Sequence, residues 1–593
     1  MLKKTIICTS IAAALSACSL EINTDKQDEQ PQAEQKLHFE LTGRAILNPS
    51  SPEGAAEIVA FHKRHNHIYA INSSGDNATV EIIDALNFDA GALTEDAEGV
   101  INNTNLTVLD TIEVFKDVAG DANSIAIDDN HDLLAVAMAG ETGTRGKIAF
   151  YDISGAQANF VKAVEVGFLP DMVTFNHSGS QVIVANEGEP SGDYTLDPIG
   201  SISVIQVDSG TPADTATEIG FTSYNDKQAE LMAQGVKFAN PGNSSVAEDL
   251  EPEYVAVSPD DATAFVSLQE NNAIAVVDLE QLTLKKIFGL GFKDWSQYKI
   301  DVSDDDGGIN LAKYQYLYGM YQPDTIASYS VNGQAYVVTA NEGDAREYID
   351  DALSGGSVED ENKAACEQKH PNGLYDYDDE EICFSYLEES RVKDLEDILP
   401  LNADLENYVD NNGGKDGLGR LIVTTALGQN DAKTEYQALY TYGARSFSIF
   451  DEAGNLVFDS GDDFESITAS IHGEAFNNNE DENEGDTRSD AKGPEPEALA
   501  IGEIDGKTYA FIGLERMGGI FVYDISEPSE ATYVDYFFNR GLNEGADITG
   551  DLAPEGMKFV NAEDSPSGKP LLIIGNEISG SVAVWQISWV DAE

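Results

Sequence analysis

A repeated pairing of acidic residues places the strongest constraint on how this chain folds. Five times a proline followed by an acid opens a short apolar run, and a glutamate closes the next apolar run. A turn signal such as Asn332-Gly333 separates the two runs, so each unit predicts a β-hairpin. Because the two ends of a hairpin lie together, both acids of a unit should meet there. The pairs are Asp171 and Glu187, Glu253 and Glu270, Asp324 and Glu342, Glu497 and Glu515, and Glu555 and Glu577.

The hairpins belong to longer units that predict an all-β fold. Short runs rich in Val, Ile, Ala and Tyr alternate with Gly, Asn and Asp, and long helical periods are lacking. Two weaker units precede the five. Together they predict a seven-bladed β-propeller, closed when a strand at 37–47 pairs with the last blade. Two unrelated β-sandwiches are the alternative. The units span about 57–84, 121–153, 167–207, 250–280, 322–451, 494–525 and 553–587.

Long acidic insertions interrupt the repeats. Residues 208–249 and 281–321 link blades, and residues 343–445 interrupt the fifth blade. Insertions of this length in a compact repeat fold are commonly functional or protective loops. We therefore expect one propeller domain over 37–593 with an insertion at 343–445. Within the insertion, Cys366 and Cys383 predict one disulfide in an exported chain.

The first residues are typical of an export signal. An apolar stretch too short to span a bilayer is followed by Leu15-Ser16-Ala17-Cys18, which resembles the lipobox of bacterial lipoproteins. We expect a signal peptide over 1–17, lipid attachment at Cys18 and a flexible tether over 18–36. Ser19 favours sorting to the outer membrane of a Gram-negative cell, on its periplasmic face or at the cell surface. An ordinary signal peptide with a coincidental cysteine is the alternative.

The charge of the chain limits its partners. Its 34 basic and 106 acidic residues give a formal net charge of −72. Such a charge repels polyanions, so we expect no nucleic-acid partner. The expected partners are a membrane, through the lipid anchor, and a small phosphorylated substrate or a surface polymer.

The ten paired acids predict a metal-binding ring. The first strand of each propeller blade lines the central channel, so the acids should crowd at one mouth of it. Crowded carboxylates repel one another unless they are protonated or neutralised by cations. Calcium suits such a site because it takes six to eight oxygen ligands in flexible geometry, and another divalent metal is the alternative. For any single glutamate, capping of a turn is the alternative role.

Two further sets of residues accompany the ring. Four amides next to ring glutamates are candidate neutral ligands: Asn186, Gln269, Asn341 and Asn576. The segment Asp301–Gly307 has the alternating oxygens of a calcium loop but lacks the Gly and Glu positions of an EF-hand. A solvated acidic turn is the alternative for that segment.

Three arginines near the acidic motifs are candidate catalytic residues: Arg346, Arg445 and Arg516. A metal that polarises the oxygens of a phosphate ester, with guanidinium groups that bind them, provides the chemistry of a phosphoesterase. The alternative is that each arginine pairs with neighbouring acids and relieves their repulsion.

The motifs around these acids resemble those of the choice-of-anchor I family. They include Asn186-Glu187-Gly188-Glu189-Pro190, Leu250-Glu251-Pro252-Glu253, Ala340-Asn341-Glu342-Gly343-Asp344, Lys492-Gly493-Pro494-Glu495-Pro496-Glu497 and Gly575-Asn576-Glu577. The resemblance implies an exported protein held at the surface by an anchor, similar to mesenchyme-specific cell-surface glycoproteins. Some relatives carry an alkaline-phosphatase label.

Three functions fit these features. The first is an exported, lipid-anchored, calcium-dependent phosphoesterase. The second is a non-catalytic calcium-binding protein used in adhesion or contact with a mineral or matrix. The third is a propeller lyase or lactonase that acts on acidic sugars.

Overall fold

Antiparallel sheets build the compact unit formed by residues 37–588. The computed structural model describes residues 35–75, 77–86, 90–242, 244–355, 359–376, 381–481 and 483–592. The predicted signal peptide, Cys18 and most of the predicted tether lie outside these residues. Of the helices in the described ranges, none has the length and hydrophobicity that a membrane crossing requires.

Seven sheets, counted over the described residues, have four or five strands. In chain order of their inner strands, the first sheet contains β2 (Val59–His62), β3 (His67–Asn72), β4 (Thr79–Asp84) and β5 (Val108–Ile112), the second contains β6 (Asp121–Asp128), β7 (Leu133–Ala139), β8 (Arg145–Asp152) and β9 (Asn159–Phe168), and the third contains β10 (Pro170–Phe175), β11 (Gln181–Asn186), β12 (Ser201–Asp208), β13 (Thr211–Pro212) and β14 (Thr217–Gly220). The fourth sheet contains β15 (Val255–Val257), β16 (Thr263–Leu268), β17 (Ala273–Asp278) and β18 (Thr283–Gly289), and the fifth contains β21 (Ile326–Val331), β22 (Gln334–Asn341), β29 (Ser446–Asp451) and β30 (Leu456–Asp459). The sixth sheet contains β31 (Pro496–Ile504), β32 (Lys507–Leu514), β33 (Ile520–Asp524) and β34 (Thr532–Phe537), and the seventh contains β37 (Pro554–Val560), β38 (Leu571–Asn576), β39 (Ser581–Asp591) and β1 (Gln35–Ile46).

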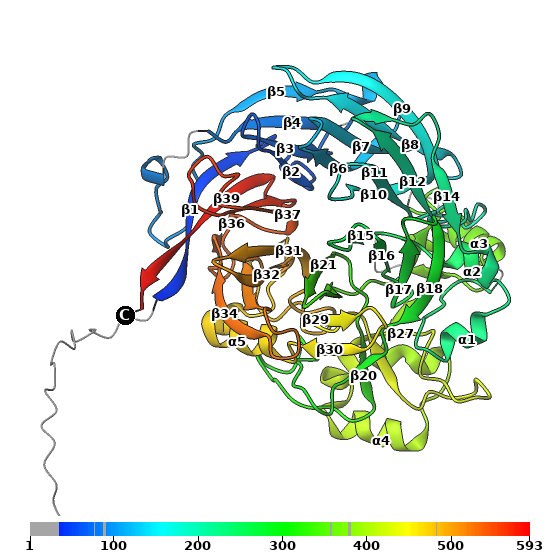
Figure 1. Ribbon diagram of the computed structural model, residues 1–593. Helices are drawn as coiled ribbons and strands as arrows, with labels where there is room; N and C mark the ends of the chain where they lie inside the picture. The colour runs from blue at the N-terminus through cyan, green and yellow to red at the C-terminus, as the bar shows by residue number, and fades with distance from the viewer. Residues whose placement is uncertain are drawn as a thin grey trace, which may run out of the picture. The chain divides into compact units, whose positions relative to one another are not determined.

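The first strands of these sheets contact one another in a closed cycle. The order is β2, β6, β10, β15, β21, β31, β37 and back to β2, and Figure 1 shows them innermost. The N-terminal strand β1 pairs with β39, so it joins the last sheet as expected. The predicted β-propeller is confirmed, and the alternative of two separate sandwiches is wrong.

Apolar side chains fill the space between neighbouring sheets. Ile71 and Val80 of the first sheet pack with Val136 and Ala149 of the second, and all four are fully buried. Similar clusters join the other neighbouring pairs. Burial of apolar surface at about 25 cal/mol per Å² makes these sheet interfaces the main source of stability.

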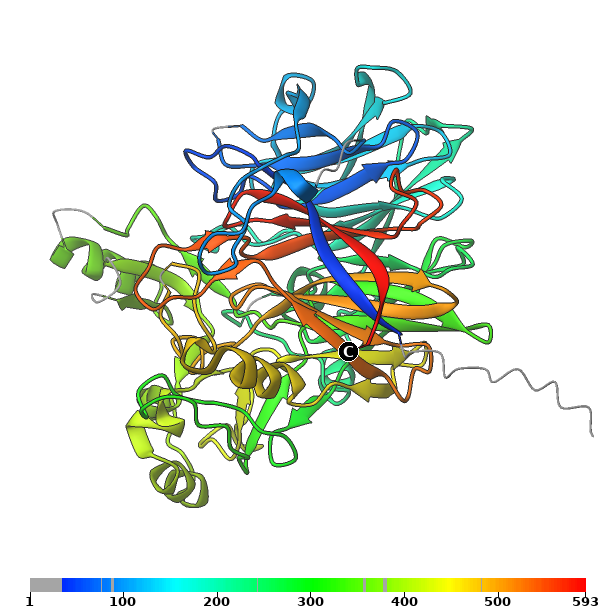
Figure 2. The ribbon, with the colours of Figure 1, turned by 90° about the vertical axis from the view of Figure 1, so that its left-hand side faces the viewer.

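The remaining elements lie in the connections. The insertion between β22 and β29 lies to the left of the sheets in Figure 2 and has strands and helices of its own. Its elements are β23 (Glu347–Ile349), α3 (Glu359–Lys369), β24 (Leu374–Asp376), β25 (Ile382–Leu387), β26 (Glu389–Arg391), α4 (Ala403–Asn411), β27 (Ile422–Thr424) and β28 (Leu439–Thr441), with short 3₁₀ turns at Val392–Asp397, Gly414–Asp416 and Leu418–Arg420. The other connections contain α1 (Gln228–Met232), α2 (Val246–Asp249), β19 (Phe292–Asp294), β20 (Leu317–Met320), α5 (Asp463–His472), β35 (Arg540–Gly541) and β36 (Thr549–Gly550), with 3₁₀ turns at Ala90–Ala92, Val114–Lys116, Thr222–Tyr224 and Gly473–Ala475.

Candidate metal centre

Three of the five proline-acid pairs lie on irregularities at the start of inner strands. Along β10, Pro170 and Val173 pair with Asn186 and Val184, so β10 carries one extra residue there. The same shift occurs at the start of β31 and β37. A bulge of this kind bends the strand and re-aims a side chain. It therefore allows the acid after the proline to face the same mouth as the glutamate that ends the next strand.

The residue before the proline adopts a left-handed backbone conformation in four of the sheets. The φ angles are 45° at Leu169, 41° at Gln322, 51° at Glu495 and 61° at Ala553. The carbonyl oxygens of Leu169, Glu495 and Ala553 accept hydrogen bonds from the backbone N–H groups of the ring glutamates at 187, 515 and 577. Non-glycine residues at such angles cost about 1–3 kcal/mol each and cluster at functional sites. The repeated backbone strain therefore indicates that this mouth of the channel is a functional site.

The structure brings the ten predicted acids together. The carboxylates lie close enough to repel one another electrostatically. Asp171 is repelled by Glu270, Asp324 by Asp171, and Glu555 by Glu577. Further such interactions join the rest of the set, namely Glu187, Glu253, Glu342, Glu497 and Glu515. The ring is thus a single electrostatic unit. Its role as a metal site stays a prediction.

Three groups of carboxylates are compact enough to hold an ion. We call them the first cluster (Glu187, Glu251, Glu270), the second cluster (Asp324, Glu342, Glu497) and the third cluster (Glu342, Glu495, Glu515). Within each, one carboxylate oxygen per residue lies within 4.8 Å of the others. Glu342 belongs to both the second and the third cluster.

Burial and mutual repulsion favour the protonated form of many ring acids. Burial, together with Glu270 and Glu189, raises the pKa of Asp171 to about 7. Burial also raises the pKa of Glu187, Glu253 and Glu497 well above the ordinary range, and neighbouring carboxylates add to the effect. Such shifts measure how strongly the site disfavours uncompensated negative charge. A bound cation removes that cost.

Five of the ten ring acids also have an unsatisfied oxygen. One buried carboxylate oxygen of each forms no hydrogen bond with the described residues, and the set is Glu253, Glu270, Glu497, Glu515 and Glu555. The same holds for Oε1 of Glu251. Buried polar atoms are nearly always satisfied in native proteins, so a group of orphaned acceptors at one place indicates a missing donor or cation.

The third cluster already contains cationic side chains. Lys492 Nζ lies 2.7 Å from Glu342 and 3.3 Å from Glu495, and Arg488 lies 2.7 Å from Glu495. Arg516 lies 3.2 Å from Glu495 and 3.0 Å from Glu515. Although burial raises the pKa of Glu495, these cations hold it at about 2. This part of the ring is neutralised from within.

The two other predicted catalytic arginines are buried and bonded to protein groups. Arg346 donates to Asp249 and Glu251 and to two backbone carbonyls. Arg445 donates to Glu465 and to three backbone carbonyls. Each side chain is 1% exposed. The geometry therefore favours the alternative, pairing with acids, for Arg346 and Arg445, and a catalytic role for any of the three arginines stays a prediction.

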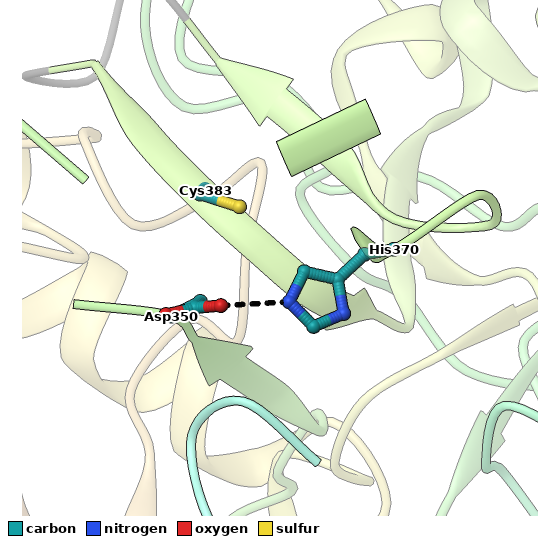
Figure 3. Close-up of side chains that lie close together, drawn as sticks. All are labelled: Asp350, His370 and Cys383. Carbon is teal, nitrogen blue, oxygen red and sulfur yellow. Dashed lines mark hydrogen bonds and ion pairs between the residues drawn. The ribbon is translucent and has the colours of Figure 1, made fainter. Parts of the chain in front are cut away.

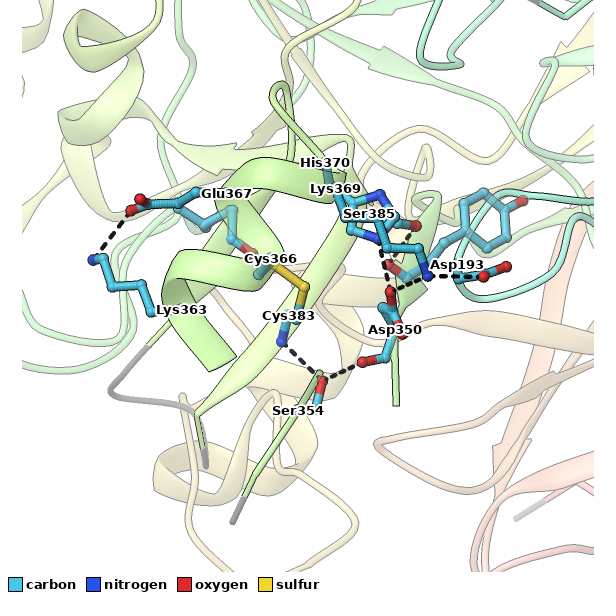
Figure 4. Close-up of a disulfide and its surroundings, with 12 residues drawn as sticks. Asp193, Asp350, Ser354, Lys363, Cys366, Glu367, Lys369, His370, Cys383 and Ser385 are labelled. Carbon is cyan, nitrogen blue, oxygen red and sulfur yellow. Dashed lines mark hydrogen bonds and ion pairs between the residues drawn. A yellow bond between two sulfur atoms is a disulfide. The ribbon is translucent and has the colours of Figure 1, made fainter. Parts of the chain in front are cut away.

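The insertion is fixed to the acid side of the propeller by charged contacts. Lys237 Nζ lies 2.7 Å from Glu388 in a pair that is almost fully buried. Lys369 links Asp350 of the insertion to Asp193 on the loop after β11, as Figure 4 shows. Arg346 of the insertion lies 2.8 Å from Glu251, so the insertion lies beside the first cluster.

The predicted disulfide between Cys366 and Cys383 is present. It joins α3 to β25 next to the hydrogen bond between His370 and Asp350, 2.8 Å long (Figure 3). Asp350, His370 and Cys383 lie close enough together to form a metal-ligand set. Because the sulfur of Cys383 is oxidised in the disulfide, it is not a thiolate ligand there.

Several acids at the mouth were not predicted from the sequence. Glu251 and Glu495 complete the first and third clusters, and Glu189 and Asp344 line a cavity next to the ring. A signal for the last two exists, because each follows a ring glutamate in the pattern Asn-Glu-Gly-acid. The glycine of that pattern is required at Gly343, where φ is 94° and an added Cβ would lie 1.9 Å from a backbone nitrogen.

The predicted amide ligands have other roles. Asn186 accepts from the backbone N–H of Gly167 and donates to Ser203, so it joins β11 to β12. Asn341 donates in the same way to Ser448. These two amides have hydrogen-bond partners on neighbouring strands, and metal ligation by them stays a prediction. Asn576 donates to the backbone carbonyl of Ser581.

The segment Asp301–Gly307 is tied to protein groups. Asp304 forms two hydrogen bonds with Arg420, of 2.7 and 2.8 Å. Asp301 accepts from the backbone N–H of Asn310 and is fully buried. Within the described ranges, this segment contributes to none of the compact carboxylate groups. Calcium binding there stays a prediction.

A cavity of about 420 Å³ adjoins the ring. It is lined by ring and insertion side chains that include Glu189, Glu270, Asp344, Tyr348, Glu389 and Lys492. A ligand in this cavity would contact both the first cluster and the cations of the third cluster.

Comparisons with known proteins agree with the sequence motifs. The model of the choice-of-anchor I domain matches residues 57–528. The mesenchyme-specific cell surface glycoprotein of Strongylocentrotus purpuratus is 28% identical over 376 residues, which cover 59% of this chain and 45% of the glycoprotein. Gigasin-3a of Magallana gigas is 29% identical over 188 residues, which cover 29% of this chain and 66% of gigasin-3a. The chain thus spans less than two thirds of each relative.

Solved structures resemble the chain only loosely. Hydrazine synthase of Kuenenia stuttgartiensis gives a TM-score of 0.41 at 12% identity and covers 91% of this chain and 96% of its own. The WD40 β-propeller domain of Doa1 gives 0.36 at 8% identity and covers 92% and 97%.

Proposed function

We propose that this chain, which belongs to the choice-of-anchor I family, is a surface β-propeller protein. We further propose that it binds calcium at the acidic mouth of its channel. The observation that carries the proposal is the set of buried ring carboxylates with an unsatisfied oxygen. Calcium provides the charge and the oxygen coordination that such a set lacks. The relative named as a cell surface glycoprotein supports the surface location.

The geometry favours binding over hydrolysis. The terminal nitrogens of Arg346 and Arg445, the two most buried of the candidate catalytic arginines, donate hydrogen bonds to protein acceptors. A phosphoesterase needs such groups free to contact the developing charge on a phosphoryl group. We therefore favour a non-catalytic role, in which bound calcium links the acidic mouth to carboxylate or phosphate groups of a surface polymer or mineral.

Calcium binding tests the proposal directly. After treatment with chelator and dialysis, we expect the protein to bind calcium in equilibrium dialysis and to show no chelator-sensitive hydrolysis of a phosphomonoester or phosphodiester. A protein that binds no calcium would overturn the proposal. Turnover that disappears with chelator would instead support the phosphoesterase.

We also propose that a lipid on Cys18 anchors the protein to the outer membrane. The lipobox-like sequence ending at Cys18 supports this. In the natural host, Cys18→Ser is expected to move the protein from the membrane fraction to the soluble fraction, as measured by immunoblot. An unchanged distribution would contradict lipid anchoring.

A further inference from the structure

The three carboxylate clusters differ in how much cationic charge they already contain. Glu342 is shared by the second and third clusters, whereas the first cluster has no member in common with either. A group that occupies Glu342 therefore affects two of the three clusters at once.

Both carboxylate oxygens of Glu342 are occupied. Lys492 Nζ donates to Oε1 at 2.7 Å, and Gln269 Nε2 donates to Oε2 at 2.8 Å. The ammonium group also lies 3.8 Å from Asp344. An ammonium group held among three carboxylates supplies the positive charge that a metal ion would supply. A divalent cation that binds Glu342 would compete with these two donors and would be repelled by the ammonium charge.

In the first cluster the corresponding cation is a guanidinium group that pairs with one member only. This cation, Arg346, binds Oε2 of Glu251 and shares its charge with Asp249. Oε1 of Glu251 and Oε2 of Glu270 are buried and have no hydrogen-bond partner in the described part of the chain. Glu251 is fully buried and Glu270 is 8% exposed. The unsatisfied oxygens of this cluster thus belong to side chains that solvent barely reaches.

We propose that Lys492 acts as a built-in counter-cation that excludes divalent cations from the second and third clusters and confines calcium to the first cluster. The inference rests on the proposed function, since it gives the location and number of the ions. Calcium affinity depends on how many charged oxygens remain free to coordinate the ion. The first cluster retains two such oxygens, on Glu251 and Glu270. The second and third clusters retain one each, on Glu497 and Glu515, and they share Glu342, whose two oxygens both have donors.

Equilibrium dialysis of four variants against the wild-type protein tests this inference. We expect one tightly bound calcium per wild-type chain. Glu251→Gln should weaken it about 10- to 100-fold, whereas Glu342→Gln should weaken it far less. Lys492→Met should add a second calcium, and the double variant Lys492→Met/Glu342→Gln should lose that second ion again.

Lys507→Met is the matched control. Lys507 pairs with Asp524 at 2.7 Å and is 58% exposed. It is the first residue of β32, whereas the ring residue Glu515 follows the last residue of that strand. Like Lys492→Met, the Lys507→Met substitution removes one lysine charge, but it does so away from the ring. The number of bound calcium ions should therefore not change.

The possible failures are distinguishable. A wild-type chain that binds no calcium would overturn the proposed function. A wild-type chain that binds calcium but loses it more in Glu342→Gln than in Glu251→Gln would overturn the inference alone. The same holds if Lys492→Met folds and binds no additional ion. The comparison of Glu251→Gln with Glu342→Gln does not require the lysine variant to fold.

Discussion

Replacement of Arg445 by methionine is expected to lower the free energy of unfolding by about 3–5 kcal/mol. Arg445 and Glu465 are each 1% exposed and form an ion pair. Removal of the guanidinium leaves the Glu465 carboxylate buried without its counter-ion. It also leaves the backbone carbonyls of Asp301, Ser489 and Ala491 without a donor. Urea unfolding followed by circular dichroism measures the loss.

Two variants separate this structural role from a catalytic one. Arg445→Met/Glu465→Gln should recover part of the loss, because the second change removes the uncompensated charge. Lys507→Met, which breaks an exposed pair, should cost less than about 1 kcal/mol. A stable Arg445→Met protein would contradict the structural role and return Arg445 to the catalytic candidates.

The positions of the ring acids could be predicted because they depend on local rules. A turn signal between two apolar runs brings the ends of a hairpin together, so Asp171 and Glu187 meet whatever the rest of the chain does. The outer strands could not be predicted as easily. The side chains of β5 are almost all exposed, so the apolar alternation that marks a strand is missing there.

The ion pairs within the site could not be predicted, because they join residues far apart in the sequence. Lys492 and Glu342 are 150 residues apart, and Arg346 and Asp249 are 97 apart. Their meeting depends on how the insertion and the loops between sheets fold over the mouth. The sequence could therefore predict which acids surround the channel but not which of them are already neutralised.

In chelator, the free energy of unfolding is expected to fall on the order of a few kcal/mol as the pH rises from 5 to 8. Burial, with repulsion from neighbouring acids, raises the pKa values of Asp171 and Glu57 to about 7. In the unfolded chain these groups titrate near pH 4. Between about pH 4 and pH 7 the folded chain therefore binds more protons than the unfolded chain, so stability is lost as the pH rises through this range.

Calcium should remove most of this dependence. As the pH rises, more of the ring carboxylates lose their protons and can coordinate a metal, and calcium at 100 times its Kd adds about 2.7 kcal/mol. At pH 5 protons compete with the metal, so the gain should be smaller. Thermal unfolding with calcium and with chelator, at equal ionic strength, measures the difference. The ionic strength must match because salt also screens the net charge of −72.

In Glu187→Gln/Glu270→Gln, which removes two charges of the first cluster, both the slope of the unfolding free energy with pH and the effect of calcium on it should shrink. Equal slopes with and without calcium in the wild-type protein would mean that the ring bears its charge without a metal.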